Sequence, residues 1–241
     1  MKKVLLGVLV SVIMLGQTAQ AVTLGAVDTG IFSRSFSSGG LSSHSNYKHD
    51  SGDMTLNYAL SLAFGGSITD DNAFAIFDLS GITGTVISAS IEMTLSSTNF
   101  QFPVDPGSFV FNEVSSDPAL FNSSYFENSN CIAIPSCNPL STGSSLYSDI
   151  GLGPVLGSVT YAGLGSQTAV MGTAGIDLIN LGLGGLFAVG INGGNSGFGN
   201  LTFATPQLTF EVAAVPVPGA IWLFGSALAG LIGFGKRRQH S

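Results

Sequence analysis

Strict alternation of apolar and polar side chains is the feature that most limits the fold of this chain. Within Thr85–Leu95, every second residue from Ile87 to Leu95 is apolar, and serine, glutamate or threonine stands between them. A period of two places successive side chains on opposite faces of a β-strand, so one face is buried and the other meets water. The same period recurs in Leu56–Phe64 and in Gln207–Val212.

Shorter segments complete an all-β pattern. Strands are also predicted at Asn72–Phe77, Ser108–Val114, Val155–Tyr161 and Gly185–Ile191, and turns at Gly81, Gly84, Pro103, Pro106 and Gly107. Only Ile176–Leu183 has helical spacing. Seven or more strands with one short helix predict a two-sheet β-sandwich of jelly-roll type. We expect this domain at residues 55–213, after a polar lead-in at residues 22–54.

The N-terminus has the three parts of a secretory signal peptide. Lys2 and Lys3 form the positive region, an apolar stretch runs from Val4 to Leu15, and Ala19-Gln20-Ala21 is a small-x-small cleavage site. An uncleaved anchor or a core helix is the alternative, but about a dozen apolar residues are too few to span a bilayer of roughly 30 Å. We therefore expect residues 1–21 to form a signal helix, removed during export by the Sec machinery.

The C-terminus carries a second apolar segment. Val217–Gly235 contains 19 residues without a charge, and as a helix it would cover about 28 Å, enough for the core of a bilayer. Trp222 lies near its start, where an amphipathic ring prefers the membrane interface. A basic tail follows at once, made of Lys236, Arg237 and Arg238. By the positive-inside rule this tail stays in the cytoplasm, and the preceding domain lies on the far side.

A proline motif stands just before that segment: Val215, Pro216, Val217, Pro218, Gly219 and Ala220. Motif, apolar segment and basic tail together (VPVPGAIWLFGSALAGLIGFGKRR) resemble the PEP-CTERM sorting signal of Gram-negative bacteria in its V-P-x-P-A form. Gly219 stands where alanine is commoner in that family, and three residues follow the basic tail. The alternatives are a plain membrane anchor and a proline that merely starts the helix.

The resemblance implies a route for the protein. In that family the signal is recognised by exosortase, an integral-membrane cysteine transpeptidase, which cuts near the motif. The chain would be held in the inner membrane only before processing. Its mature form, at the cell surface or outside the cell, would contain no transmembrane helix. Residues 214–241 are accordingly expected to be a sorting signal.

A second resemblance concerns the fold. The stretch AFAIFDLSGITGTVISASIEMTL looks like the core of jelly-roll modules in exported bacterial proteins, among them DNRLRE-type and carbohydrate-binding-like domains. FVFNEVSSDPALF, LYSDIGLGPVLGSVTY and GGLFAVGI resemble blocks that recur in PEP-CTERM proteins of this architecture. These blocks are packing signatures, so they imply a fold and identify no catalytic residue. Asp78 is expected to cap the turn at Asp78–Gly81.

The charge of the expected mature chain excludes one class of partner. Residues 22–215 hold all 14 acidic residues of the chain but only two basic ones, Arg34 and Lys48, so their formal charge is −12, against −7 for the whole chain. Such a surface repels phosphates and anionic headgroups. No nucleic acid is expected to bind.

Cys131 and Cys137 are the only cysteines. In an oxidising compartment, a pair this close is expected to form a disulfide that closes a surface loop and stabilises it by about 2–3 kcal/mol. A metal site would need histidine or cysteine partners nearby, and this stretch of the sequence offers none.

Two polar clusters each leave two interpretations open. His44, His49 and Asp50 suit a metal or acid–base site, or else a flexible polar lead-in. Asp70 and Asp71 suit a turn that binds structural calcium, or else a solvated turn, since the sequence has no EF-hand or nonapeptide calcium repeat. No other cofactor is expected.

The sequence shows no catalytic constellation. It lacks a G-x-S-x-G elbow and an H-E-x-x-H pair. Glu92 and Glu211 lie on polar faces of predicted strands, and Glu113 and Glu127 have no evident partner. We therefore expect a non-catalytic protein of the cell surface or exopolysaccharide matrix, adhesive or carbohydrate-binding, with candidate platforms at Tyr47, Tyr125, Tyr147 and Tyr161. The alternatives are a polysaccharide-active hydrolase using Glu113 and Glu127, and a self-associating S-layer-like protein.

Overall fold

The structure is a computed structural model. It describes residues 19–37, 42–49, 54–60, 67–100, 107–122, 126–128, 142–161, 163–193, 199–213 and 225–227. The chain divides into two units: Ala21–Val212 forms one compact body, and the two terminal segments form the other. The predicted signal helix at residues 1–21 and transmembrane helix at residues 217–235 lie outside the described residues, apart from residues 19–21 and a helical turn at 225–227. None of the described helices has the length and hydropathy to cross a membrane.

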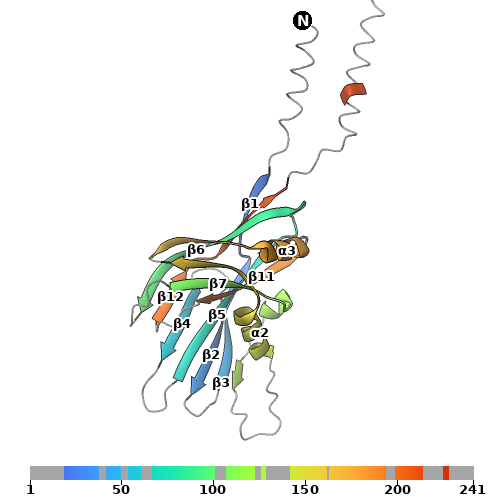
Figure 1. The fold of residues 1–241 in the computed structure, drawn as a ribbon. Coiled ribbons are helices and arrows are strands. Elements are labelled where there is room, and N and C mark those ends of the chain that lie inside the picture. Colours follow the sequence, from blue (N-terminus) through green and yellow to red (C-terminus); the bar gives the residue numbers. More distant parts are fainter. Residues whose placement is uncertain are drawn as a thin grey trace, which may run out of the picture. The chain divides into compact units, whose positions relative to one another are not determined.

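The strands form two antiparallel sheets, as predicted (Figure 1). The first sheet contains β1 (Gln20–Gly25), β13 (Gln207–Val212), β6 (Val86–Phe100) and β10 (Gly165–Val170). The second contains β3 (Ser42–His49), β2 (Asp28–Ser37), β5 (Ser67–Asp78), β11 (Leu186–Gly193), β7 (Gly107–Glu113) and β9 (Val155–Tyr161), with the short β8 (Phe126–Asn128) beside β3. Two further strands join the sheets. β12 (Gly199–Phe203) pairs with β6 of the first sheet and with β4 (Met54–Leu60), and β4 pairs with β5 of the second sheet.

The main core lies between the two sheets. The apolar residues that alternate along β6, from Ala89 through Ile91 and Met93 to Leu95, are all buried. They join Leu208 and Phe210 of β13 in one cluster with inward residues of the second sheet, namely Ala73, Ala75, Phe77, Phe109 and Phe111. Full burial of a phenylalanine or leucine contributes about 1.5–3 kcal/mol. From Ala89 to Leu95 the two-residue period of the sequence therefore produces this core. Ile87, which was expected on the same buried face, is instead 50% exposed beside a register shift in the pairing with β13.

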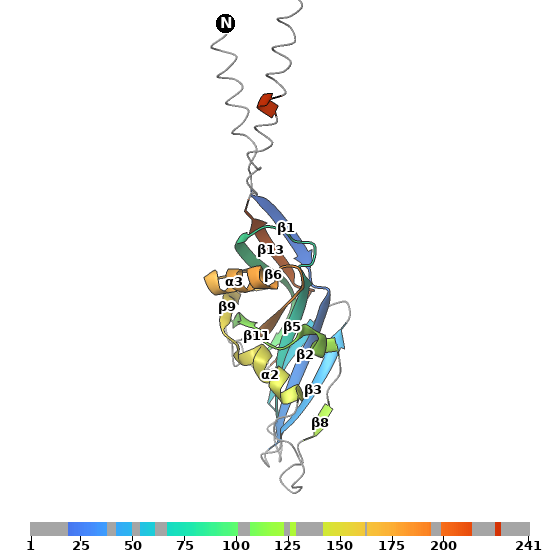
Figure 2. The same cartoon turned by 90° about the vertical axis from the view of Figure 1, so that its right-hand side faces the viewer.

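The second sheet is buried on its outer face as well. All five residues of the run from Ala73 to Phe77 are at most 2% exposed. Phe74 and Ile76 face away from the main core into a second cluster, which is covered by α2 (Thr142–Leu152) and the 3₁₀ helix η1 (Pro118–Asn122) (Figure 2). The rings of Phe74 and Phe121 lie 4.7 Å apart between centroids. A strand covered on both faces reads as a continuous apolar run, which explains the AFAIF sequence.

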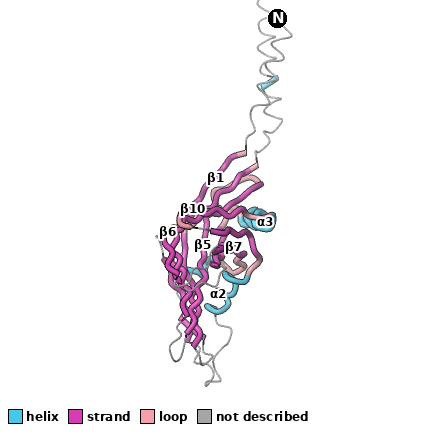
Figure 3. The backbone as a smooth tube through the Cα atoms, turned by 60° about the vertical axis from the view of Figure 1, so that its left-hand side comes forward, coloured by secondary structure: helices cyan, strands magenta, loops and turns pink. Residues whose placement is uncertain are grey.

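Three asparagines of the second sheet anchor the C-terminal part of α2. The amides of Asn72 and Asn112 donate to the main-chain oxygens of Tyr147 and Ile150, each at 3.2 Å, and Asn192 donates to Gly151 at 3.5 Å. The carbonyls of Ile150 and Gly151 are in the last turn of α2, where carbonyls have no partner within the helix, so the bonds from Asn112 and Asn192 act as a cap supplied by the sheet. Figure 3 shows α2 and α3 (Thr173–Gly182) packed against the strands.

A glycine permits this close approach. A Cβ on Gly190 of β11 would overlap the main-chain carbonyl of Ile150. Any side chain at that position would therefore keep the asparagine bonds to α2 from forming at their present length. Gly190 stands opposite Asn112 in the β7–β11 ladder, at the centre of the contact.

Asp149 fixes the opposite side of α2. Its carboxylate accepts hydrogen bonds from the backbone N–H and hydroxyl of Ser115, at 3.2 and 2.7 Å, and from the backbone N–H of Ser116 at 2.7 Å. Burial acts to raise the pKa of Asp149, but the hydrogen bonds from Ser115 and Ser116 outweigh it and lower the pKa below the ordinary value. The charged form of Asp149 therefore holds α2 to the segment that follows β7.

The structure differs from the sequence prediction in several elements, among them β10 and β12, which lie where no strand was predicted. Residues 22–54, expected to be a polar lead-in, contain β2 and β3 and most of β1, and α2 is a second helix where only one was expected. β2 pairs with β5 along its whole length, and it buries Ile31 and Phe32 on its two faces. Its other residues are mostly serine and glycine, so tertiary pairing rather than apolar alternation makes it a strand. The expected helix at Ile176–Leu183 corresponds to α3.

Candidate binding face

The first sheet has one face that no described element covers. We call it the hydroxyl face. It includes outward-pointing polar residues of β1, β13, β6 and β10, all exposed or half-buried: Thr23, Gln207, Thr209, Glu211, Ser88, Ser90, Glu92, Thr94, Ser166 and Thr168. The apolar Val170 of β10, opposite Ser90 and 75% exposed, lies on the same face. The residues between them along each strand point into the core, so the alternation that builds the core also builds this face.

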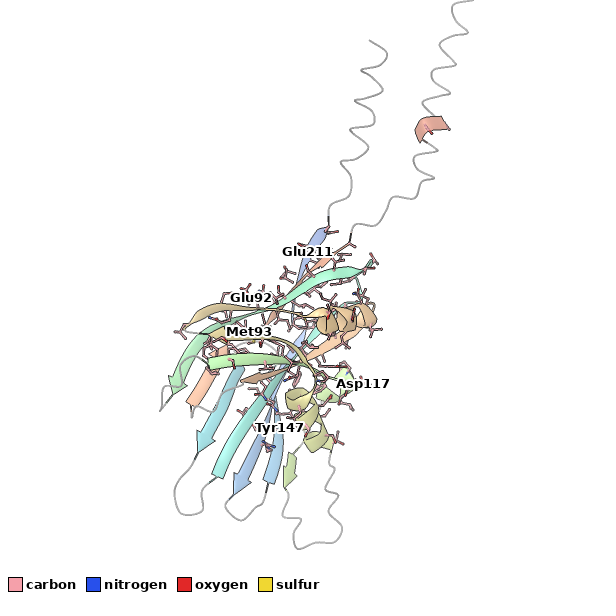
Figure 4. All side chains as sticks on the ribbon, viewed as in Figure 1. Glu92, Met93, Asp117, Tyr147 and Glu211 are labelled. Atoms are coloured by element: carbon pink, nitrogen blue, oxygen red, sulfur yellow. The ribbon has the colours of Figure 1, made fainter. Side chains whose placement is uncertain are left out.

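Strand pairing brings these side chains into rows. Thr209 of β13 stands opposite Ser90 of β6, and Glu92 stands between Gln207 and Thr168 on its two neighbouring strands. Thr23 and Thr209 share a hydrogen bond of 3.0 Å between their hydroxyls. The hydroxyl of Ser166 donates to Oε1 of Glu92 at 2.6 Å. Figure 4 labels Glu92 and Glu211, which mark this face on β6 and β13.

The chemistry of the hydroxyl face is hydrogen bonding by hydroxyls, one amide and two carboxylates. None of β1, β6, β10 and β13 contains a histidine, cysteine, lysine or arginine. Each hydroxyl both donates and accepts, and such groups match the hydroxyls of a neutral sugar polymer.

One row of paired positions crosses the second sheet. Tyr58, Asp70, Arg34, His44 and Glu127 occupy paired register positions on β4, β5, β2, β3 and β8. Backbone pairing thus brings five positions from separate segments of the sequence to one level of the sheet.

Arg34 also connects this row to α2. Its guanidinium carbon lies 4.7 Å from the centre of the Tyr147 ring, a cation–π contact. Tyr147 itself is only 4% exposed.

The structure describes only part of the two polar clusters considered as metal sites. His44 and His49 are five residues apart in β3, so their positions fall on opposite faces of the strand, and Asp50 lies outside the described residues. Asp70 and Asp71, expected in a turn, lie inside β5. Asp71 is fully buried. Consecutive strand positions face opposite ways, so these two do not form a chelating loop. The described residues contain no group of three potential metal ligands.

The glutamates considered for hydrolysis do not form a pair. Glu113 ends β7 and Glu127 lies in β8, strands that are not neighbours. Glu92 and Glu211 are on the hydroxyl face, as their polar strand positions predicted. Asp78 caps its turn as expected, since its carboxylate accepts from the backbone N–H of Ser80 at 2.9 Å.

The tyrosine platforms expected for carbohydrate stacking are not available where the structure describes them. Tyr147 and Tyr161 are buried, at 4% and 8% exposure. Burial also raises the pKa of Tyr161. Tyr125 lies outside the described residues, as do Cys131 and Cys137 of the predicted disulfide, the motif at residues 215–220 and the basic tail at residues 236–238.

No protein-family model matches the chain, and no curated protein matches it significantly.

Sequence reasoning did not find the hydroxyl face as a unit. The alternating Ser88, Ser90, Glu92 and Thr94 were visible in the sequence, but only as the wet side of one strand. Their partners Thr168 and Thr209 come from strands that begin far away in the sequence, and pairing alone brings them together.

Proposed function

We propose that this chain is an exported, non-catalytic protein of the cell surface or exopolysaccharide matrix, sorted by an exosortase through residues 214–241, and that its hydroxyl face contacts neutral polysaccharide. We also infer that its sandwich is related to the jelly-roll modules of exported proteins. β5 and β6, which carry that resemblance, are consecutive strands that lie in different sheets, as sandwich connections require.

The observation that supports export most directly is where the compact unit ends. It spans Ala21–Val212, while the expected cuts lie before Val22 and near the motif that begins at Val215. Removal of both terminal segments would therefore leave the compact unit nearly whole. The strands at its two ends, β1 and β13, are neighbours.

The charge and chemistry of the hydroxyl face support a neutral polymer as the ligand. The face carries hydroxyls, one amide and two carboxylates, and no basic residue occurs in its four strands. With a formal charge of −12 on residues 22–215, uronate-rich or sulfated polymers would be repelled. A neutral polymer meets no such barrier.

Processing is tested by the intact mass of the protein recovered from the culture medium. We expect a chain that begins at Val22 and ends near residues 215–220, without Trp222 or the basic tail. A secreted form that keeps both would contradict sorting by cleavage. A form cut only at the N-terminus and found in the membrane fraction would indicate a plain anchor.

Polysaccharide contact is tested by removing hydroxyls without changing shape. Thr94→Val and Thr168→Val replace exposed threonines of the hydroxyl face with a residue that fits a strand equally well. Since each hydrogen bond contributes about 0.5–1.5 kcal/mol, the double variant should bind the host's neutral exopolysaccharide about tenfold more weakly in a sedimentation assay.

The matched control for this experiment is Thr160→Val, an exposed threonine on β9 of the other sheet. It should bind as the unchanged chain does. If the double variant and the control bind equally well, the hydroxyl face is not the binding site. If none of the three proteins binds, the chain does not bind this polysaccharide.

A further inference from the structure

β1 is an edge strand with a free side. Within the described strands it pairs only with β13. The backbone N–H of Ala26 donates to the carbonyl of Pro206 at 3.1 Å. Because backbone groups alternate in direction along a strand, the N–H groups of Leu24 and Val22 also point to β13, and those of Thr23 and Gly25 point away from it.

This edge lacks the features that keep sheet edges from pairing. The β1 sequence QAVTLG contains no lysine, no proline and no charge. The opposite end of the fold is different: β3 carries Lys48 and two histidines, and the three-residue β8 covers part of it. β9 and β10 lie against each other, since a Cβ on Gly157 would come within 2.8 Å of the Val170 carbonyl oxygen. Lysines and very short strands are the usual protection of an edge, and β1 has neither.

The side chains of β1 favour an identical strand as the partner. In an antiparallel pair centred on Leu24, Thr23 of each copy stands opposite Gly25 of the other, and these two pairs exchange the outward hydrogen bonds. Leu24 then meets Leu24 of the second copy at a non-hydrogen-bonded position, where side chains are closest. Leu24 and Val22 are only partly buried in the single chain and pack at the margin of the core.

We propose that two copies of this chain associate through antiparallel pairing of β1 over residues 22–26, which continues the first sheet and its hydroxyl face from one copy into the next. The interface is self-complementary, as a two-fold dimer requires. It uses only residues that remain after removal of residues 1–21. The proposed dimer can therefore be tested independently of export and of polysaccharide binding.

The decisive variant is Thr23→Pro. The N–H of Thr23 points to the free side, so proline leaves the hydrogen bonds to β13 intact but removes the donor that the second copy needs. Thr173→Pro is the matched control: Thr173 is exposed at the first position of α3, and the residue before it already has the extended ψ of 178° that proline favours.

The measurement is sedimentation equilibrium of the full chain in a mild nonionic detergent, at about 0.15 M salt to screen the repulsion between acidic copies. We expect a monomer–dimer equilibrium whose dissociation constant rises at least tenfold in Thr23→Pro and stays unchanged in Thr173→Pro. A chain that stays monomeric at all concentrations would overturn the proposal, and so would a Thr23→Pro chain that dimerises normally.

Hydrogen exchange of the unchanged chain covers the case in which Thr23→Pro disturbs folding. The amides of Thr23 and Gly25 should become slower to exchange as protein concentration rises, while those of Leu208 and Phe210 in β13 stay constant. Protection at Thr23 and Gly25 that does not depend on concentration would contradict pairing between copies.

Discussion

Gly190→Ala is expected to destabilise the domain by about 3 kcal/mol, a fall in Tm on the order of 6–12 °C. The added Cβ overlaps the main-chain carbonyl of Ile150. A long side chain could relieve such an overlap by changing its rotamer, but a backbone carbonyl inside a helix cannot. α2 must therefore move outward. That movement stretches the hydrogen bonds from Asn72 and Asn112 and uncovers the outer face of the second sheet. Thermal unfolding followed by circular dichroism measures the effect.

Gly185→Ala is the control for this substitution. Its Cβ would have only the carbonyl of Gly182 nearby, at an ordinary contact distance of 3.7 Å. We expect a change within about 0.5 kcal/mol for this variant. If the two alanine variants unfold at the same temperature, the close docking of α2 on Gly190 is not a determinant of stability.

Asp149→Ala is expected to lower the free energy of unfolding by about 1–2 kcal/mol near neutral pH, because it removes hydrogen bonds to a charged group. Partial exposure of the site to water keeps the effect this small. The pKa of Asp149 is lower in the folded chain than its ordinary value of 3.8. The carboxylate therefore stabilises the fold fully above that ordinary value, and this contribution disappears as the pH falls through the folded pKa. The difference in urea midpoint between the unchanged chain and the variant should be constant from pH 7 to about pH 5 and narrow below about pH 4.

Asp177→Ala provides the comparison on the other helix. Asp177 is exposed on α3, and its replacement should change stability by no more than about 0.5 kcal/mol at any of these pH values. An Asp149→Ala deficit that persists undiminished at pH 3 would show that packing of the side chain, rather than its charge, holds α2 in place.

The sequence predicted those strands whose side chains alternate. β6 and β13 bury one face and expose the other, so Ile91, Glu92 and Phe210 each lie on the expected side. β7, β9 and β11 were located to within two residues at each end. β6 and β13 carry their own signal, because each has one wet face and one dry face. β11 is buried from Phe187 to Ile191 and has the continuous apolar run of a strand covered on both faces.

The elements that were missed obtain their structure from partners. β2 has few apolar residues and is held by β5 and β3 on its two sides. α2 begins in a glycine- and serine-rich stretch, typical of a loop, and its apolar contact with the sheet comes from Leu146, Tyr147 and Ile150. The burial of Phe74 beneath α2 could not be predicted from the local sequence either, because the α2 residues that cover it lie about 70 positions later in the chain.

The same limit applies to the candidate site. His44, Asp70 and Glu127 were considered as metal ligands or catalytic groups, but in separate segments of the sequence, and Arg34 was noted only for its charge. The sheet aligns them in a single row through four pairings that no local pattern contains. The hydroxyl face arises in the same way. The residue types of both surfaces could therefore be read from the sequence. Which of these residues are neighbours is determined by strand pairing.

The adjacency of β1 and β13 has a mechanical consequence. A chain tethered at both termini would be loaded at Gln20 and Val212, which begin and end two neighbouring antiparallel strands. Tension applied there pulls along the hydrogen bonds that join the strands rather than across them. The hydrogen bonds are then loaded and broken one after another, instead of sharing the force. Until one end is released, the terminal strand pair is the point at which a pulling force opens the domain first.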